Sequence, residues 1–246
     1  MTLVWLRVYL TGDAVGVLFA VDKSTVSRHT RPLLRLVRDR GQETLGWPEE
    51  ARALLDTADG ADGADGVVIV DATEQRVERS RDNATQKAHD AGKKKAHTRK
   101  TLIVVNERGR LRYVSPAVLG ATHDLTLLRQ CGARQVIPPD LSLMGDSGFQ
   151  GRQNDAPARS VALPYKGSKA HPLTPEQKLH HALLSRIRIV VENTLAEMKH
   201  CRALTDVFRH PLDLYDHIVV AIASVVTRRA DQRDADQRDA VFPVAV

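Results

Sequence analysis

The feature that most constrains this chain is a run of four aliphatic residues, Val67–Val70, that ends in an acid, Asp71. Such a run predicts a buried strand, and an acid at its carboxyl end is held rigidly while its oxygens face a cleft. Asp146 follows a second apolar segment in a glycine-rich turn, and Glu192 lies in a helical pattern. Two strand-end carboxylates and one helix carboxylate can hold two Mg²⁺ ions about 4 Å apart. Each acid alone decides little, because an Asp after a strand is more often a turn residue or a helix cap.

Five segments carry sequence motifs around these acids: Asp71–Glu74, Gly92–Thr101, Thr122–Leu128, Gly145–Gly151 and Leu173–Lys178. Together they resemble, in the same order, the DDE transposases of bacterial insertion sequences, in the branch similar to eukaryotic Harbinger elements. The resemblance runs from about Asp13 to about Ala230. It implies a ribonuclease-H-like catalytic domain whose catalytic and metal-binding acids are Asp71, Asp146 and Glu192.

The helix that carries Glu192 resembles a signature of such families: Tyr, two residues, Arg, three residues, Glu, six residues, Lys. Arg188, Glu192 and Lys199 keep these spacings, and Ser185 stands in place of the Tyr, which keeps a hydroxyl and loses the ring. The three side chains share one helical stripe, so two cations able to reach DNA phosphates flank a metal-binding carboxylate. The alternative is an ordinary surface pair between Arg188 and Glu192, worth about 0.3–0.5 kcal/mol. The apolar neighbours of the pair favour a packed helix instead.

A helix-turn-helix is predicted near the N-terminus. Residues 13–19 form the first predicted helix, 20–22 a tight turn, and 23–30 the start of a second helix that has Asp22 as its N-cap and ends near Arg40. In this motif the second helix enters the major groove with its first residues near the base edges. Five residues are therefore candidate DNA contacts: Lys23, Ser24, Thr25, Ser27 and Arg28. Ala20 stands where such turns often have Gly, at a cost of about 1 kcal/mol.

Four regions are expected along the chain. They are an all-α helix-turn-helix DNA-binding region at 1–40, a flexible acidic linker at 41–66, a catalytic domain at 67–230 and a flexible charged tail at 231–246. Relatives carry more sequence before the helix-turn-helix. We therefore expect this region to be N-terminally truncated and the chain to recognise element ends poorly.

The expected fold class of the catalytic domain is α/β, with a ribonuclease-H-like mixed sheet flanked by helices. In that plan the first acid lies on the first, central strand and the second acid follows the fourth. Periodicity predicts strands at 67–70, 98–106, 110–115, 142–145 and 159–163, and helices at 124–130, 175–200 and 211–229. Asp124 is expected to be the N-cap of the first of these helices.

The densest run of cationic side chains comprises Lys93, Lys94, Lys95, His97, Arg99 and Lys100. Because the run leads into an apolar strand beside Asp71, we expect it to line the cleft and bind DNA phosphates without sequence preference. The alternative is a solubilising strand edge. Because Mg²⁺ prefers oxygen ligands, His97 and His123 are expected to contact DNA or the metal-binding residues, and not the metal itself.

Composition agrees with a DNA-binding protein. The net charge of +6 and the pI near 9.5 favour a polyanionic partner, here double-stranded DNA. Cys131 and Cys201 lie far apart and match no zinc spacing, which predicts reduced thiols. Arg7 and Asp13 interrupt the apolar N-terminus before it could span a membrane. We expect no membrane contact and a cytoplasmic bacterial protein that joins the nucleoid when it binds DNA.

The resemblance implies a DNA transposase. Two divalent cations, Mg²⁺ or Mn²⁺, would support cleavage at the terminal inverted repeats of an element, and the freed 3′ hydroxyl would attack target DNA. Joining two ends requires two active sites, so the family also implies a homo-oligomer on DNA. Two alternatives stay open: an element-derived DNA-binding protein with weak or defective catalysis, and a metal nuclease that cleaves without joining.

Overall fold

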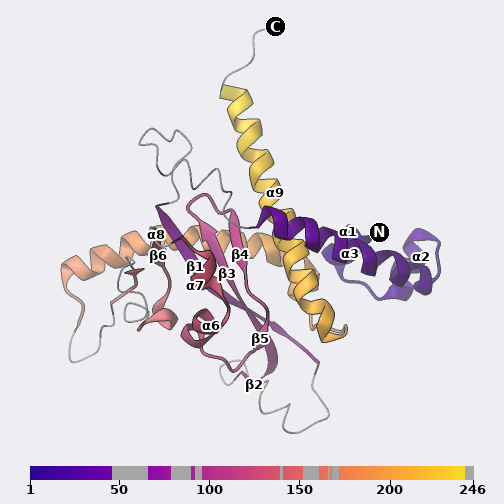
Figure 1. The fold of residues 1–246 in the computed structure, drawn as a ribbon, viewed down its shortest axis with the longest axis horizontal. Helices are drawn as coiled ribbons and strands as arrows, with labels where there is room; N and C mark the ends of the chain where they lie inside the picture. Colours follow the sequence, from indigo (N-terminus) through magenta and orange to yellow (C-terminus); the bar gives the residue numbers. More distant parts are fainter. Residues whose placement is uncertain are drawn as a thin grey trace.

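The computed structural model describes residues 1–45, 66–78, 90–91, 96–138, 141–151, 161–165, 167 and 172–241 (Figure 1). A mixed sheet with helices on both faces forms the larger part, and the N-terminal helices lie at one end of it beside α9. Several predicted features fall outside the described residues: most of the linker, the lysines Lys93, Lys94 and Lys95, the first residues of the strand at 159–163, and the last residues of the tail.

The sheet is built around β1 (Val67–Arg76). This strand pairs antiparallel with β3 (Ala96–Asn106) on one edge and parallel with β6 (Ser142–Met144) on the other. A central first strand, with an antiparallel neighbour on one side and parallel strands on the other, is the predicted ribonuclease-H-like plan, which is thereby confirmed. The other strands are β2 (Asp90–Ala91), β4 (Leu111–Val114) and β5 (Val118–Leu119), each antiparallel to β3, and β7 (Val161–Ala162), parallel to β6.

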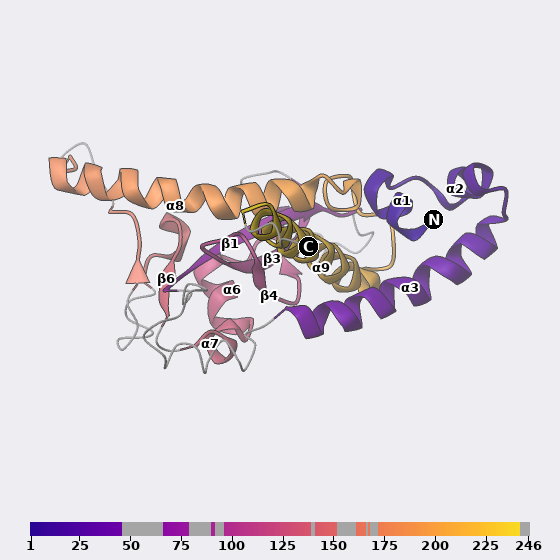
Figure 2. The same ribbon diagram turned by 90° about the horizontal axis from the view of Figure 1, so that it is seen from above.

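Both faces of the sheet are covered, because successive side chains of a strand point to opposite sides. On one face Val68 and Val70 share a core with Leu127 of α6 (Asp124–Gln130) and with α7 (Ala133–Val136). On the other face Ile69 shares a core with α8 (Pro175–Lys199) and α9 (Tyr215–Val241). Figure 2 shows α8 along one side of the sheet and α6 and α7 on the opposite side. Burial on both faces explains why β1 begins as a continuous aliphatic run instead of an alternating one.

The start of α8 is fixed by a capping box. Thr174 Oγ1 accepts a hydrogen bond from the Gln177 backbone N–H, and the Gln177 side chain accepts one from the Thr174 backbone N–H. Pro175 occupies the first helical turn, where its missing N–H costs nothing. The predicted helix at 175–200 is confirmed, and its buried residues include Leu184 and Val191.

Helix α9 extends further than predicted. We expected a helix to 229 and a flexible tail from 231, but the helix continues to Val241. Two charged residues of this extension have partners on other elements: Asp231 pairs with Arg110 at 2.9 Å, and Arg233 binds Glu197 through contacts of 3.2 and 3.1 Å. These pairs support a helix that has little apolar surface to bury. No helix in the described part of the chain is both long and apolar enough to cross a membrane.

The two helices and the turn predicted at the N-terminus are present. They are α2 (Gly12–Phe19) and α3 (Lys23–Thr44), preceded by α1 (Thr2–Val8). Ala20 lies in the turn with φ of 53°, the left-handed conformation that favours glycine. A Cβ added at Gly16 would lie 2.5 Å from the Val21 carbonyl oxygen, so the turn approaches α2 too closely for any side chain there. Helix α3 runs beyond its predicted end and packs against α9.

Candidate active site

Asp71 and Asp146 come together because β1 and β6 run side by side. In their parallel register Ile69 lies opposite Met144, and an acid comes two residues later in each segment. Asp71 lies within β1, which runs on past the predicted end at residue 70, and Asp146 follows β6. Parallel neighbours in register place such equivalent residues next to each other. The first acid therefore lies on the central strand and the second directly after its parallel neighbour, where the fold predicts them.

The backbone holds one oxygen of each carboxylate. Asp71 Oδ1 accepts a hydrogen bond of 2.7 Å from the Ala72 N–H, and Asp146 Oδ1 accepts one of 2.7 Å from the Gly148 N–H. The second bond makes Asp146 the N-cap of the short 3-10 helix η1 (Ser147–Phe149). Both carboxylates are thus oriented by local backbone and not by long, mobile side-chain contacts.

Asp71 lies in a strongly perturbing environment. Burial raises the pKa of Asp71 from 3.8 to about 6. The Ala72 hydrogen bond and the charge of Arg188 act to lower this pKa, whereas the charges of Asp146 and Asp124 add to its rise. A buried carboxyl surrounded by other acids is the setting expected of a functional group, since an added cation would favour its ionised form.

Glu192 lies apart from the two strand acids. Its side chain is 56% exposed on α8 and pairs with Arg188, whose Nη2 lies 3.5 Å from Glu192 Oε1. Arg188 also acts on the pKa of Asp71, so a guanidinium connects the helix acid with the strand acid. Among the residues that the structure describes, no three His, Cys, Asp or Glu side chains are grouped so that they could hold a metal ion. Asp146 is among the charges that act on the Asp71 pKa, and Glu192 is not, so two of the three predicted acids lie near each other and Glu192 is not grouped with them.

Lys100 occupies a different place from the one predicted. It is 7% exposed, and its ammonium donates to Thr122 O at 2.8 Å and Asp124 Oδ1 at 2.9 Å and lies 3.1 Å from Glu74 Oε1. Burial acts to lower the pKa of Lys100, but Asp124 and Glu74 outweigh burial and raise it. Three protein oxygens engage the Lys100 ammonium in this structure, so the prediction that Lys100 binds DNA phosphate finds no support here.

Asp124 has another place than the predicted one. It is not the N-cap of α6: His123 is, and its Nδ1 accepts from the Leu125 N–H. A Cβ added at Gly148 would lie 2.7 Å from Asp124 Oδ2 and 2.9 Å from Asp146 Oδ1. Asp124 therefore packs against the turn that carries Asp146, and only glycine fits between them.

Two other members of the predicted cationic run have structural contacts. Arg99 Nη2 donates to Ala117 O at 2.8 Å, and its guanidinium lies over the Tyr215 ring, 6.0 Å from the centroid. Arg99 therefore ties β3 to the loop before β5 and to α9, contrary to a free phosphate-binding role. His97 lies on β3 opposite Asp90 and is half-buried.

The candidate DNA contacts of α3 lie in its first two turns. Lys23, Ser24, Ser27 and Arg28 are exposed, and Thr25 is partly buried. Arg28 Nε donates to Ser24 O at 3.3 Å and its Nη2 to Thr25 Oγ1 at 3.3 Å, so the guanidinium folds back on its own helix. Asp22 is the N-cap residue, as predicted, but its side chain makes no capping hydrogen bond.

A ribonuclease-H-like sheet with one carboxylate on its central strand and a second just after the parallel neighbour of that strand defines a class of nucleic-acid-processing domains. The match to a family model is consistent with that class: residues 70–226 match the DDE superfamily endonuclease model. The match covers more than half of the chain and includes Asp71, Asp146 and Glu192. The chain belongs to this family of DDE endonucleases.

A curated relative is the probable transposase for insertion sequence element IS702 of Microchaete diplosiphon. It is 29% identical over 144 residues, which are 58% of this chain and 50% of the relative. The chain thus spans half the length of that relative. A solved structure, the Mos1 mariner paired end complex with Mn, aligns over 90% of this chain and 72% of its own with 11% identity and a TM-score of 0.22, which is too low to carry an argument.

Proposed function

We propose that this chain is a DNA transposase that cleaves phosphodiesters at the ends of an element and joins the freed ends to target DNA. The observation that supports the proposal most is that β1 and β6 are parallel neighbours and that the charge of Asp146 acts on Asp71, in a chain of the DDE endonuclease family. The similarity to a probable insertion-sequence transposase supports it. Glu192 is the proposed third acid.

The two strand acids fit a hard divalent cation. Both offer carboxylate oxygens, the donors that Mg²⁺ and Mn²⁺ prefer. The charge of Asp146 helps to raise the pKa of Asp71 to about 6, and a cation between the two would offset that repulsion. Asp71 and Asp146 would hold the ions, with Glu192 completing the set. Two such ions, when bound, supply activation of the attacking oxygen and stabilisation of the leaving oxygen.

Arg188 would change its partner when the chain binds DNA. It pairs with Glu192 at 3.5 Å and acts on Asp71, so it occupies the space between the two acids. A DNA phosphate could bind the guanidinium through two short hydrogen bonds, whereas the contact with Glu192 is a single one of 3.5 Å. On binding DNA, Arg188 would turn to the phosphate and leave Glu192 to face Asp71 and Asp146.

Recognition of the element ends is assigned to the start of α3. Lys23, Ser24, Ser27 and Arg28 are exposed there, at the helical positions that meet base edges when such a helix enters the major groove. Double-stranded DNA with the terminal inverted repeats is one partner, and target DNA is the other. Because joining two ends needs two active sites, the working form would be a homo-oligomer on DNA in the nucleoid.

The test is an assay that separates binding, cleavage and joining. The full chain is incubated with Mg²⁺ or Mn²⁺, a labelled duplex that carries the inverted repeats flanking its gene, and a target plasmid. The proposal requires metal-dependent cleavage at the repeat end and covalent joining to the plasmid. Cleavage without joined product would identify a nuclease instead, and binding without cleavage would identify a DNA-binding protein that has lost catalysis.

A further inference from the structure

The turn that carries Asp146 is contacted at two points by the start of α6. A Cβ added at Gly148 would lie 2.7 Å from Asp124 Oδ2, and a Cβ added at Gly151 would lie 3.2 Å from Leu125 Cδ2. Asp124 and Leu125 are the first two residues of α6. The first turn of that helix therefore packs against the turn so closely that glycine is needed at both points.

Asp124 presents a different oxygen to each of its neighbours. Its Oδ1 accepts a hydrogen bond of 2.9 Å from the Lys100 ammonium, and its Oδ2 is the atom that faces Gly148. Gly148 in turn donates its N–H to Asp146 Oδ1 at 2.7 Å. A Cβ at Gly148 would also lie 2.9 Å from that same oxygen, so this glycine alone separates the carboxylate of Asp124 from that of Asp146.

Resting on the function proposed above, we propose that Asp124 is a positioning residue for the cation site. Its carboxylate, held by Lys100, contacts Gly148 and keeps Asp146 in the orientation that the Gly148 N–H defines. Burial raises the pKa of Asp71 most, and among the neighbouring acids Asp146 adds more to that rise than Asp124 does. Asp124 thus acts on the site less through its charge, which Lys100 offsets, than through its contact with the turn.

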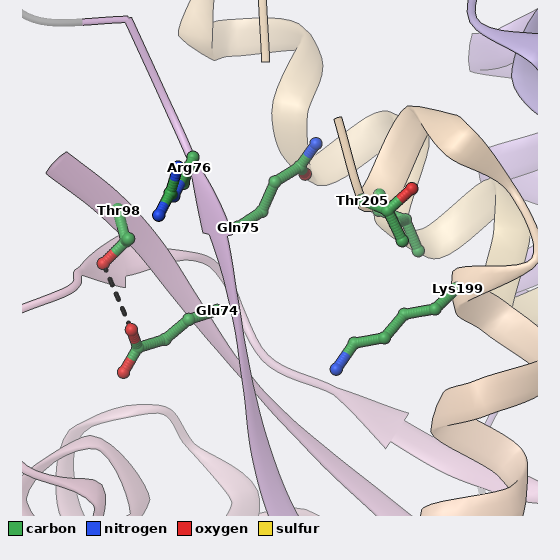
Figure 3. A pocket seen from close by; sticks show the side chains of 7 residues that line it. Glu74, Gln75, Arg76, Thr98, Lys199 and Thr205 are labelled. Carbon is green, nitrogen blue, oxygen red and sulfur yellow. Dashed lines mark hydrogen bonds between the residues drawn. The ribbon is translucent and has the colours of Figure 1, made fainter. Parts of the chain in front are cut away.

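The anchor of Asp124 is itself held in place. The buried Lys100 ammonium also donates to Thr122 O at 2.8 Å and lies 3.1 Å from Glu74 Oε1. Glu74 Oε2 accepts a hydrogen bond of 3.3 Å from Thr98 Oγ1 (Figure 3). Because a satisfied buried polar network is rigid, β1 and β3 together fix the position of the Asp124 carboxylate.

Asp146 needs such support more than Asp71 does. Asp71 lies within the ten residues of β1, which pair with β3 along most of their length. Asp146 lies beyond the three residues of β6, at the start of a single turn of 3-10 helix. A short turn after a short strand has few backbone hydrogen bonds of its own, so its orientation depends on its neighbours. Groups that hold a metal ligand in place commonly contribute about tenfold or more to metal affinity.

The experiment measures the affinity of the full chain for Mn²⁺, without DNA, from the electron paramagnetic resonance signal of the free ion. Asp124→Asn keeps the size of the side chain and an oxygen that can accept from Lys100, whereas Asp124→Ala removes the contact with Gly148. We expect Asp124→Ala to weaken Mn²⁺ binding at least about tenfold and Asp124→Asn to weaken it less than about threefold. Asp124→Ser, which also lacks the Oδ2 atom, replaces Asp124→Ala if that variant does not fold.

Asp216→Ala is the matched control. Asp216 lies in the first turn of α9, as Asp124 does in α6, and its Oδ1 accepts a hydrogen bond of 2.9 Å from the Ala117 N–H. Its replacement should lower the free energy of unfolding in urea and leave the Mn²⁺ affinity of the folded chain unchanged. The inference is overturned if Asp124→Ala behaves like this control, or if Asp124→Asn loses as much affinity as Asp124→Ala.

Crystal structures of the metal-free wild type and Asp124→Ala test the inference independently of the proposed function. We expect the 2.7 Å hydrogen bond from the Gly148 N–H to Asp146 Oδ1 to be lost in the variant. An Asp146 carboxylate that keeps this bond and its orientation would overturn the inference. If the wild-type chain neither binds Mn²⁺ nor cleaves DNA, the proposed function fails, and the two structures still decide whether Asp124 positions Asp146.

Discussion

At the residue scale, the backbone around Asp71 and Asp146 determines how their carboxylates are oriented. One oxygen of each is fixed by an N–H group within two residues, and the strand register places the second acid near the first. Glu192 has neither constraint, since it is exposed on a helix and paired with Arg188. The backbone thus preorganises the two strand acids, and the proposed site would require Glu192 to move toward them.

The catalytic assignment predicts that Asp71→Asn, Asp146→Asn and Glu192→Gln each lower cleavage at least about a hundredfold. Each change keeps the size of the side chain and removes the charge that would hold a cation, so DNA binding should stay within about twofold of wild type. Cleavage is measured on a labelled duplex in Mg²⁺, and binding by anisotropy. Glu197→Gln is the control, since Glu197 lies on the same helix and faces Arg233. If a variant keeps more than about a hundredth of wild-type cleavage, the residue replaced in it is not one of the catalytic acids.

The raised pKa of Asp71 predicts a pH-dependent effect on stability. Its pKa rises from 3.8 to about 6 on folding, so the folded state binds more protons in that window and stability falls as pH rises through it. Asp71→Asn removes this loss and keeps an oxygen that can accept from Ala72. In the presence of a metal chelator, the free energy of unfolding of the variant should exceed that of wild type by about 2 kcal/mol at pH 7 and equal it below about pH 4. Urea unfolding at both pH values measures the difference, and an equal effect at both would contradict the assignment.

At the element scale, β1 and β3 are joined by a buried charged bridge as well as by their backbone. Glu74 lies directly opposite Lys100 in the antiparallel register, and the start of α6 supplies Asp124 to the same ammonium. Lys100 thus links β1 and β3 to the start of α6. Removing one partner of such a bridge leaves buried charge without compensation, which is the costly case.

Lys100→Met should therefore lower the free energy of unfolding by about 3 kcal/mol, because two carboxylates lose their shared cation. Lys199→Met removes an exposed lysine from α8 and should cost less than about 0.5 kcal/mol. Urea denaturation of the two variants makes the comparison. If Lys100→Met costs no more than Lys199→Met, the bridge does not exist in solution as it does in the structure.

The elements were predictable from the sequence where the signal is local. The aliphatic run of β1 and the apolar spacing of α8 predicted those elements with their acids. The role of Lys100 was not predictable. The sequence alone does not distinguish a lysine that faces solvent from one that faces a glutamate on the neighbouring strand, because that depends on the register of β1 and β3. The separation of Glu192 from Asp71 depends in the same way on how α8 lies across the sheet, which helical periodicity does not specify.

At the scale of the whole molecule, the N-terminal helices are packed directly onto the catalytic sheet's helix layer. Helix α3 crosses α9 at Gly41, and a Cβ there would lie 2.6 Å from the Ser224 Cβ. At the other end Tyr9 receives a hydrogen bond of 3.1 Å from the Arg209 N–H, and its ring lies 5.5 Å from that of His210. The start of α3, the proposed DNA reader, is therefore held at a fixed position relative to Asp71 and Asp146.

This fixed geometry predicts that Gly41→Ala uncouples end recognition from cleavage. The added methyl group forces α3 away from α9, at a cost of about 1–3 kcal/mol, while the sheet and its acids stay as they are. Cleavage at the inverted repeat should fall several-fold relative to metal-dependent nicking of unrelated DNA, and Ser224→Gly in the same chain should restore the ratio by making room for the methyl group. The two cleavage rates are measured on matched duplexes in Mg²⁺. An unchanged ratio in Gly41→Ala, despite lower stability, would mean that the contact of α3 with α9 serves stability alone and that the reader acts independently of the catalytic domain.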